Sequence, residues 1–158
     1  MRLMPLVLFL YVSTPQAAVF NAFVVRVLDG DTIDVSKIPA KGVGHDSYQR
    51  IRFADIDAPE KAQPFGMQSR AILAAAIQGK QISVDVSARD KYGRYIGTVT
   101  VDGKNINRYM IETGSAWVYR QYCKDKVMFA LELKARYGKA GLWAEKNPVP
   151  PWEFRHAS

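Results

Sequence analysis

Five short runs of β-branched and alternating residues constrain the fold of this 158-residue chain more than any other feature. Each run is bounded by Gly, Asp or Pro, as strands commonly are. The five predicted strands cover residues 23–28, 32–36, 48–55, 81–87 and 95–101. With 48% hydrophobic residues, a chain of this length can bury one core, so we expect one domain.

Helical segments separate the third strand from the fourth and follow the fifth. They cover residues 65–79, 105–113 and about 125–137. Alanines favour helix in the first segment, and Gly79 and Gly114 suit the positions just past the ends of the first two. Three strands, a helix, two strands and then helices is the order of an OB-type barrel with C-terminal helices. The predicted fold class is therefore α+β, mainly β: a five-stranded OB-type barrel with about three α-helices.

The N-terminus has the pattern of an export signal. Arg2 precedes an apolar run over residues 3–12, and small residues follow around Ala17 and Ala18. The run is too short to span a bilayer comfortably, and a buried first strand is its alternative interpretation. We expect residues 1–18 to be a signal peptide and residues 19–158 to form the domain. The protein would then be secreted or periplasmic, with no stable membrane insertion after the signal is removed.

The net charge and the few cysteine and histidine residues restrict the kinds of partner and site that this chain can have. The net charge of +7 favours an anionic partner, although a membrane surface, nucleic acid and mere solubility all remain open on charge alone. The single cysteine, Cys123, cannot form an internal disulfide and is too little for a thiolate metal site. Neither His45 nor His156 resembles a positioned base, which argues against nucleases that depend on a histidine.

Acidic residues stand at the ends of two predicted strands. In VLDGDT an Asp-Gly turn is followed by Asp31, which leads into the second strand. In IRFADIDAPE the third strand ends in Asp57 and Glu60. Adjacent strands of a barrel can bring these three carboxylates together at one end. An oxygen-only cluster suits a hard cation such as Ca²⁺ or Mg²⁺.

Two arginines extend this pattern: Arg52 on the third strand and Arg94 in RDKYGR before the fifth. Guanidinium groups facing a carboxylate-held cation would neutralise a phosphodiester and its transition-state charge. Taken singly, each acid is typical of an ordinary turn or strand end. All five positions together predict phosphoryl chemistry. We interpret Asp29, Asp34 and Asp55 as turn or surface acids, with Asp29 a candidate outer-shell group.

DGDT, then an arginine, then IDAPE and then DKYGR resemble the thermonuclease family, the staphylococcal nuclease-like enzymes, over about residues 23–143. The resemblance implies an OB barrel with three helices. It also implies Ca²⁺-dependent hydrolysis of DNA and RNA at the 5′ side of the phosphodiester, leaving 3′-phosphate ends. Nucleic acid is then the expected partner, Ca²⁺ the expected cofactor and a monomer the expected state.

By the same resemblance, Asp31 and Asp57 would be Ca²⁺ ligands, and Ala58 would give its backbone carbonyl to the metal. Glu60 resembles the general base that takes a proton from the attacking water. Positioning of that water is an alternative role for Glu60.

Arg52 and Arg94 resemble the two phosphate clamps, and Tyr92 in DKYGR would border the nucleotide pocket. In SAWVYRQYCKDK, Trp117 and Tyr119 are candidates for a base-stacking surface, and Tyr119 and Tyr122 are candidates for the pocket rim. Core packing is the alternative for aromatic residues this close to a predicted helix end.

The sequence departs from the family in two places. The loop over residues 37–50 is longer, and the KAQP segment after Glu60 is short. The main rival function is a catalytically inactive OB-fold module that binds nucleic acid or protein; such a module should lack one of the five site residues, and this chain retains all five. A second rival is a hydrolase for another phosphodiester or a small nucleotide, against which the basic surface argues. DNA or RNA preference, and endo- or exonucleolytic action, are not determined by the sequence.

Overall fold

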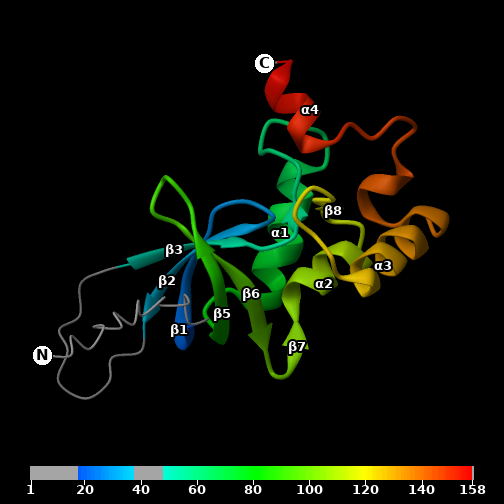
Figure 1. Cartoon of the computed structure of the whole chain (residues 1–158). Helices are drawn as coiled ribbons and strands as arrows, with labels where there is room; N and C mark the ends of the chain where they lie inside the picture. The colour runs from blue at the N-terminus through cyan, green and yellow to red at the C-terminus, as the bar shows by residue number, and fades with distance from the viewer. Residues whose placement is uncertain (1–17, 38–47, 158) are drawn as a thin grey trace, which may run out of the picture.

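Five strands close into a β-barrel in the computed structural model, which describes residues 18–37 and 48–157 (Figure 1). The barrel strands are β1 (Ala18–Val27), β2 (Thr32–Lys37), β3 (Tyr48–Phe53), β5 (Gln81–Arg89) and β6 (Tyr95–Val101). Neighbours in the order β3-β2-β1-β5-β6 pair antiparallel. A parallel pairing of β3 with β6 closes the ring. The predicted five-stranded OB-type barrel is confirmed.

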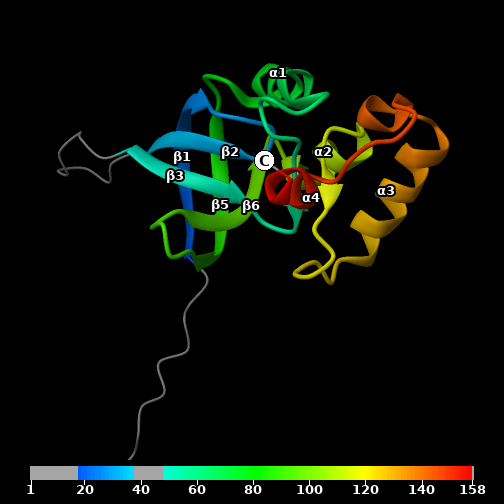
Figure 2. The same cartoon turned by 90° about the horizontal axis from the view of Figure 1, so that it is seen from above.

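Helices gather on one side of the barrel (Figure 2). They are α1 (Gly66–Ile77), α2 (Ile106–Glu112), α3 (Lys126–Tyr137), the short 3-10 helix η1 (Gly141–Ala144) and α4 (Pro151–His156). Three two-residue strands complete the fold: β4 (Ile56–Asp57), β7 (Lys104–Asn105) and β8 (Trp117–Val118). In both views α3 lies on the side of α2 that faces away from the barrel. The three predicted helices are present. The helix α4 is an addition to the prediction; it begins with Pro151, a residue suited to the first position of a helix.

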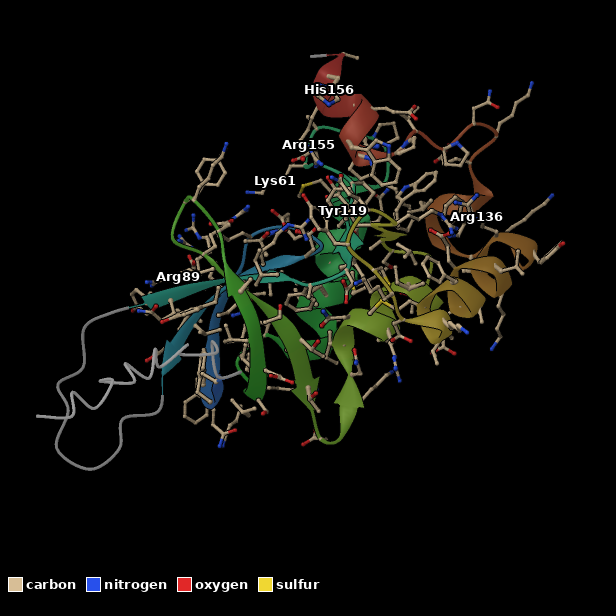
Figure 3. All side chains as sticks on the ribbon, viewed as in Figure 1. Lys61, Arg89, Tyr119, Arg136, Arg155 and His156 are labelled. Atoms are coloured by element: carbon tan, nitrogen blue, oxygen red, sulfur yellow. The ribbon has the colours of Figure 1, made fainter. Side chains whose placement is uncertain are left out.

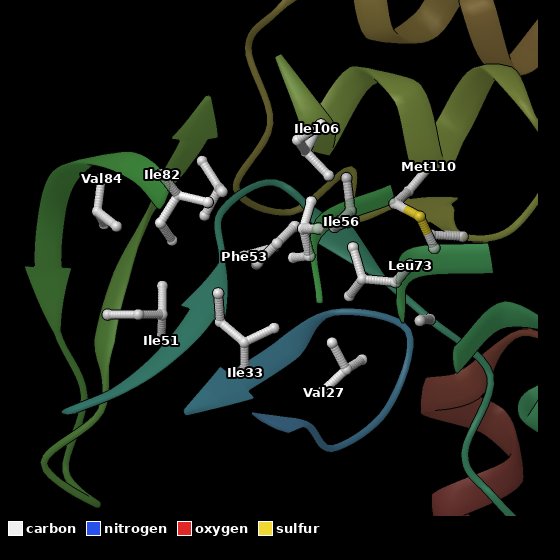
Figure 4. Close-up of a cluster of buried hydrophobic side chains, with 14 of the residues drawn as sticks. Val27, Ile33, Ile51, Phe53, Ile56, Leu73, Ile82, Val84, Ile106 and Met110 are labelled. Carbon is white, nitrogen blue, oxygen red and sulfur yellow. The ribbon is translucent and has the colours of Figure 1, made fainter. Parts of the chain in front are cut away.

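The core fills the barrel and continues under the helices (Figure 4). Ile33, Ile51 and Phe53 from β2 and β3 are almost fully buried, and Leu73 of α1 and Met110 of α2 close the cluster. Burying each such side chain stabilises the fold by about 1.5–3 kcal/mol. The barrel rim is therefore a rigid base for the turns that leave it.

The first barrel strand begins earlier than predicted. Ala18, the last residue of the predicted signal peptide, already pairs with Val86 of β5. The rest of that predicted peptide, and residues 38–47 of the long loop, lie outside the described residues. Of the helices that the structure describes, none combines the length and the apolar character needed to cross a membrane.

Candidate active site

The two acidic motifs meet at one rim of the barrel. The carboxylate of Asp31, just after the β1–β2 turn, accepts a hydrogen bond of 2.6 Å from the backbone N–H of Ala58. Gly30 makes this approach possible, because a Cβ at that position would lie 2.7 Å from the Cβ of Ala58 and 1.9 Å from Oγ of Ser69 on α1. The glycine of DGDT therefore lets its turn pack directly against IDAPE.

Arg52 joins the two buried aspartates of this rim. Its Nη2 donates to Oδ1 of Asp57 at 2.7 Å, and its Nη1 lies 3.1 Å from Oδ2 of Asp31. Its Nη1 also donates to the backbone carbonyl of Ile56 at 2.9 Å. Asp57 is only 1% exposed, in the β4 strand that pairs with β8. The guanidinium is thus fixed by contacts on several sides.

Negative charge at Asp31 is only partly compensated. Burial raises the pKa of Asp31 to about 7, against the opposing effect of Arg52. Asp29 and Asp57 add to this rise in pKa. The backbone N–H of Asp31 donates to Oδ1 of Asp29 at 3.0 Å, so the carboxylate of Asp29 folds back onto the turn that carries Asp31. A cation bound beside Asp31 would favour the ionised carboxylate, which burial disfavours, and would therefore stabilise this site.

Arg155 of α4 also binds this cluster, and no sequence motif indicates it. Its Nη2 donates to Oδ2 of Asp57 at 2.7 Å, and its Nη1 donates to Oε1 of Glu60 at 2.8 Å. Its hydrogen bonds to Asp57, and then to Glu60, raise the pKa of Arg155. Figure 3 shows Arg155 close to Lys61, the residue that follows Glu60. The C-terminal helix therefore places a positive charge on two of the three predicted acids.

Aromatic contacts hold α4 in this place. The ring of Trp152 stacks on Tyr119, with centroids 5.7 Å apart and planes at 8°, and meets Trp117 edge-on at 5.7 Å. Tyr119 in turn contacts Tyr122, with centroids 4.9 Å apart. The two tyrosines predicted at the pocket rim thus lie together beside α4, and Tyr122 is exposed. Trp117 belongs to the core.

Arg94 and Tyr92 do not belong to the acid cluster in the part of the chain that the structure describes; they line a separate pocket. Both lie on the loop between β5 and β6, and Nε of Arg94 donates to Oδ2 of Asp90 at 2.7 Å. Arg52 pairs with Ile96, which is two residues beyond Arg94 on the neighbouring strand. The acid cluster therefore contains one predicted phosphate clamp, Arg52, and the other, Arg94, lies on the loop that leads into the neighbouring strand β6.

The chemistry of the donors fits a hard cation. The carboxylates of Asp31 and Asp57 and the carbonyl of Ala58 are oxygens, the ligands that Ca²⁺ prefers. Among the described residues there is no set of three or more Asp, Glu, His or Cys arranged to hold a metal. Backbone oxygen and water would thus have to complete the coordination. Both oxygens of Asp57 accept hydrogen bonds from Arg155, so a cation would have to displace that arginine.

The interpretation of Asp34 as a turn or surface acid is wrong. Asp34 is buried, and it accepts hydrogen bonds of 2.7 Å from Arg26 and 2.8 Å from Arg50. These two arginines occupy the paired positions on β1 and β3 and cover the carboxylate from both sides. Hydrogen bonds from Arg50 and Arg26 lower the pKa of Asp34 despite burial.

Comparison with known proteins agrees with the fold. A family model described as "Staphylococcal nuclease homologue" matches residues 50–145. A relative from Escherichia coli O157:H7, "Uncharacterized endonuclease", is 44% identical over 156 residues, which cover 98% of this chain and 97% of the relative. The "Micrococcal nuclease" of Shigella flexneri is 40% identical over 160 residues, covering 94% and 88%. An "Uncharacterized endonuclease" of Haemophilus influenzae is 34% identical over 132 residues, covering 84% and 71%.

The barrel, its acidic rim and these similarities define a class of nucleases built on an OB-type fold. Within that class, the chain belongs to the staphylococcal nuclease homologue family. The range matched by the family model contains Arg52, Asp57, Glu60 and Arg94. Asp31 lies before that range, and the hydrogen bond to Ala58 brings it to the site.

Proposed function

We propose that this protein is a Ca²⁺-dependent nuclease that hydrolyses phosphodiester bonds of DNA or RNA. The observation that carries the proposal is an acidic cluster at one rim of the barrel, in which Arg52 joins Asp31 to Asp57 and Arg155 joins Asp57 to Glu60. Membership of a nuclease family supports the reaction class. Ca²⁺ and the choice of polymer are part of the proposal.

Asp31 and Asp57, with the carbonyl of Ala58, would hold the Ca²⁺. When bound, the cation supplies positive charge that polarises the phosphodiester. The raised pKa of Asp31 supports this assignment, because a nearby cation favours the ionised carboxylate that burial disfavours. Arg52 keeps the two aspartates at a fixed separation through its contacts with both.

Glu60 is the proposed general base. It is partly exposed at the cluster, so that water can reach its carboxylate. Its backbone is fixed by hydrogen bonds with Gln63, at 3.1 Å from the Glu60 N–H and 2.9 Å to the Glu60 carbonyl. Pro59 adds a locked φ just before it. Glu60 would take a proton from the attacking water once Arg155 releases its oxygen; positioning the water is the alternative role.

Arg52 and Arg94 are the proposed phosphate-binding residues. Arg52 presents a guanidinium at the acid cluster, where it would face a non-bridging phosphate oxygen. Arg94, partly exposed on the β5–β6 loop, would bind a second oxygen and stabilise charge in the transition state. Tyr92 beside Arg94, and Tyr119 with Tyr122 beside α4, would contact the nucleotide.

One assay tests the proposal. The purified protein is mixed with single-stranded DNA, duplex DNA and RNA, each with Ca²⁺, with Mg²⁺ and with excess chelator. We expect cleavage with Ca²⁺ and none with chelator. Undiminished cleavage in excess chelator would refute the metal mechanism.

A catalytically inactive binding module is the second candidate, and one observation favours it. Guanidinium groups of Arg52 and Arg155 already neutralise Asp57, as in a site that is only structural. Binding of nucleic acid without cleavage under every metal condition of that assay would establish this candidate instead.

We also propose that the protein is exported, because an apolar run over residues 3–12 follows Arg2, as in a signal peptide. Mass spectrometry of the protein from its native host would show a chain that begins near residues 18–20. An intact N-terminus in a cytoplasmic fraction would contradict export.

A further inference from the structure

A groove rich in arginine lies beside the acid cluster, between the outer face of β1–β3 and the β5–β6 loop. Its volume is about 730 Å³. The side chains that give it its character are four arginines and two tyrosines: Arg26, Arg50, Arg89, Arg94, Tyr48 and Tyr92. Asp34 is the only acid among the described residues that line it. The surplus of positive charge predicts an anionic ligand.

One wall of the groove is built around Asp34. This buried carboxylate binds Arg26 at 2.7 Å and Arg50 at 2.8 and 3.1 Å. The side chain of Arg50 is nevertheless 48% exposed. Asp34 therefore orients two guanidinium groups whose outer edges still face the groove.

The opposite wall is held by contacts within the β5–β6 hairpin. Nε of Arg89 donates to the carbonyl of Gly93 at 3.2 Å, and its guanidinium lies 4.6 Å from the ring centroid of Tyr95. Asp90 holds Arg94 in the same hairpin. Figure 3 shows Arg89 well away from Arg155 and the helical side of the molecule. Arginines thus face the groove from both walls in fixed orientations.

The groove shares Arg94 with the proposed catalytic residues, and its residue Arg50 is close to Arg52 on β3. Arg94 lines it and is also a proposed phosphate-binding residue. Arg50 lies two residues before Arg52 on β3, and alternate residues of a strand point to the same face. Their Cα atoms are therefore about 6–7 Å apart along one surface.

We propose that this groove binds a single strand of nucleic acid, whose phosphates next to the scissile one lie on Arg26, Arg50 and Arg89. This rests on the proposed function, because the scissile phosphate is placed at the acid cluster. Arginine is suited to the task, since its planar group binds two phosphate oxygens at once.

Exposed aromatic rings favour a single strand over a duplex. Tyr48 and Tyr92 line the groove and are 70% and 73% exposed, more than packing against the barrel would require. Bases stack on such rings only when they are not already stacked in a duplex. The groove combines stacking surfaces with a phosphate-binding wall, as sites for single strands do.

The test is binding without cleavage, measured by fluorescence anisotropy of a labelled single-stranded oligonucleotide in excess chelator. The variants are Arg50→Ala and Arg89→Ala. Arg108→Ala on α2 is the matched control, because Arg108 also pairs with an aspartate, Asp125, and its side chain is 42% exposed. Circular dichroism verifies the fold of each variant.

We expect each groove variant to bind roughly tenfold more weakly, the scale of one charge-assisted hydrogen bond. The slope of log affinity against log salt should fall by about 0.7 for each phosphate that the variant no longer binds. The control should change neither the affinity nor the slope. An equal loss of affinity in Arg108→Ala would show that only net charge matters, and would overturn the groove. Duplex binding as tight as single-strand binding, with the same loss in Arg50→Ala, would overturn the choice of occupant.

Cleavage separates the groove from the proposed function. With Ca²⁺, the groove variants should cleave a dinucleotide at the wild-type rate and show a raised KM for a long single strand. An equal loss on both substrates would contradict a groove that binds only the flanking phosphates. If the wild-type protein cleaves nothing, the proposed function fails, while the anisotropy measurement still decides the groove.

Discussion

Two buried aspartates in this molecule, Asp57 and Asp34, each bind two arginines, yet their surroundings suit opposite ligands. Asp57 binds Arg52 and Arg155. Asp34 binds two arginines that come from the neighbouring strands β1 and β3. The local ion pairs are similar in geometry, with shortest distances of 2.7 Å at both aspartates.

The difference lies in the groups around each pair. Asp31 and Glu60 lie around the Asp57 site, and they leave acid groups available for a cation. Arg89 and Arg94 line the groove beside Asp34, which leaves an excess of positive charge for phosphate. An aspartate that binds two arginines therefore does not by itself indicate a function. The charged side chains around each ion pair decide the ligand. Further acids favour a cation at Asp57, and further arginines favour an anion at Asp34.

Removal of the cation should have the largest effect and should act on the Asp57 site alone. We expect excess chelator to reduce cleavage to background, because the proposed site loses the charge that polarises the phosphate. Binding of an oligonucleotide at the groove should persist under the same conditions. Added Ca²⁺ should restore cleavage and Zn²⁺ should not, since the proposed ligands are all oxygens. Loss of binding together with cleavage would show that the two sites are not separate.

Arg94 belongs both to the groove and to the proposed catalytic residues. Arg94→Ala should lower kcat by roughly 10²-fold. One donor to transition-state charge is worth on the order of 3 kcal/mol. Single-turnover cleavage of a dinucleotide, which is too short to reach Arg26, Arg50 or Arg89, measures this loss. Arg108→Ala serves as the control for charge. A change in KM alone would place Arg94 with the groove and not with the catalytic residues.

Arg155→Ala should tighten Ca²⁺ binding by roughly two- to fivefold. The guanidinium competes with the cation for Asp57, and a partly exposed ion pair contributes about 0.5–1 kcal/mol. Isothermal titration calorimetry in the absence of nucleic acid measures the dissociation constant. Arg155→Lys, which keeps the charge but loses the paired hydrogen bonds, should lie between wild type and Arg155→Ala. Weaker Ca²⁺ binding in Arg155→Ala would mean that the arginine supports the cation site.

The smallest effect concerns Asp34 and pH. Its folded-state pKa is lowered by Arg50 and Arg26, so the unfolded chain binds more protons as pH falls. The stability contributed by Asp34 should be fully present above the ordinary aspartate pKa of about 3.9 and be lost as the pH falls from there through the lower folded-state pKa. Asp34→Asn should therefore be less stable than wild type at pH 7, by about 1 kcal/mol at most, and the gap should narrow at pH 3. Urea denaturation at both pH values measures it; a constant gap would mean that the ion pairs contribute nothing.

Local chemistry explains which parts of this structure can be predicted. The glycine of DGDT and the proline of IDAPE fix their own turns, so short motifs are enough to assign Asp31 and Asp57 to one rim. The same reasoning cannot find Arg155, because it lies 95 residues from Glu60 and reaches it through the packing of Trp152 on Tyr119.

The prediction for Asp34 fails for a different reason. It considers the residue alone, although Arg26 and Arg50 occupy the positions that pair with it on the neighbouring strands. Strand register, which the turn motifs partly determine, carries that information. Considering charged residues across predicted strand pairs would indicate the buried ion pairs.

The most direct test of catalysis at the acid cluster is kcat for Glu60→Gln under saturating Ca²⁺ and substrate, with circular dichroism confirming the fold. The substitution keeps the size of the side chain and removes its ability to accept a proton. We expect normal binding of nucleic acid and a loss of roughly 10²-fold or more in kcat, the usual scale for a positioned general base. Turnover close to wild type would contradict this expectation, and would mean that the Glu60 carboxylate serves only to bind Arg155.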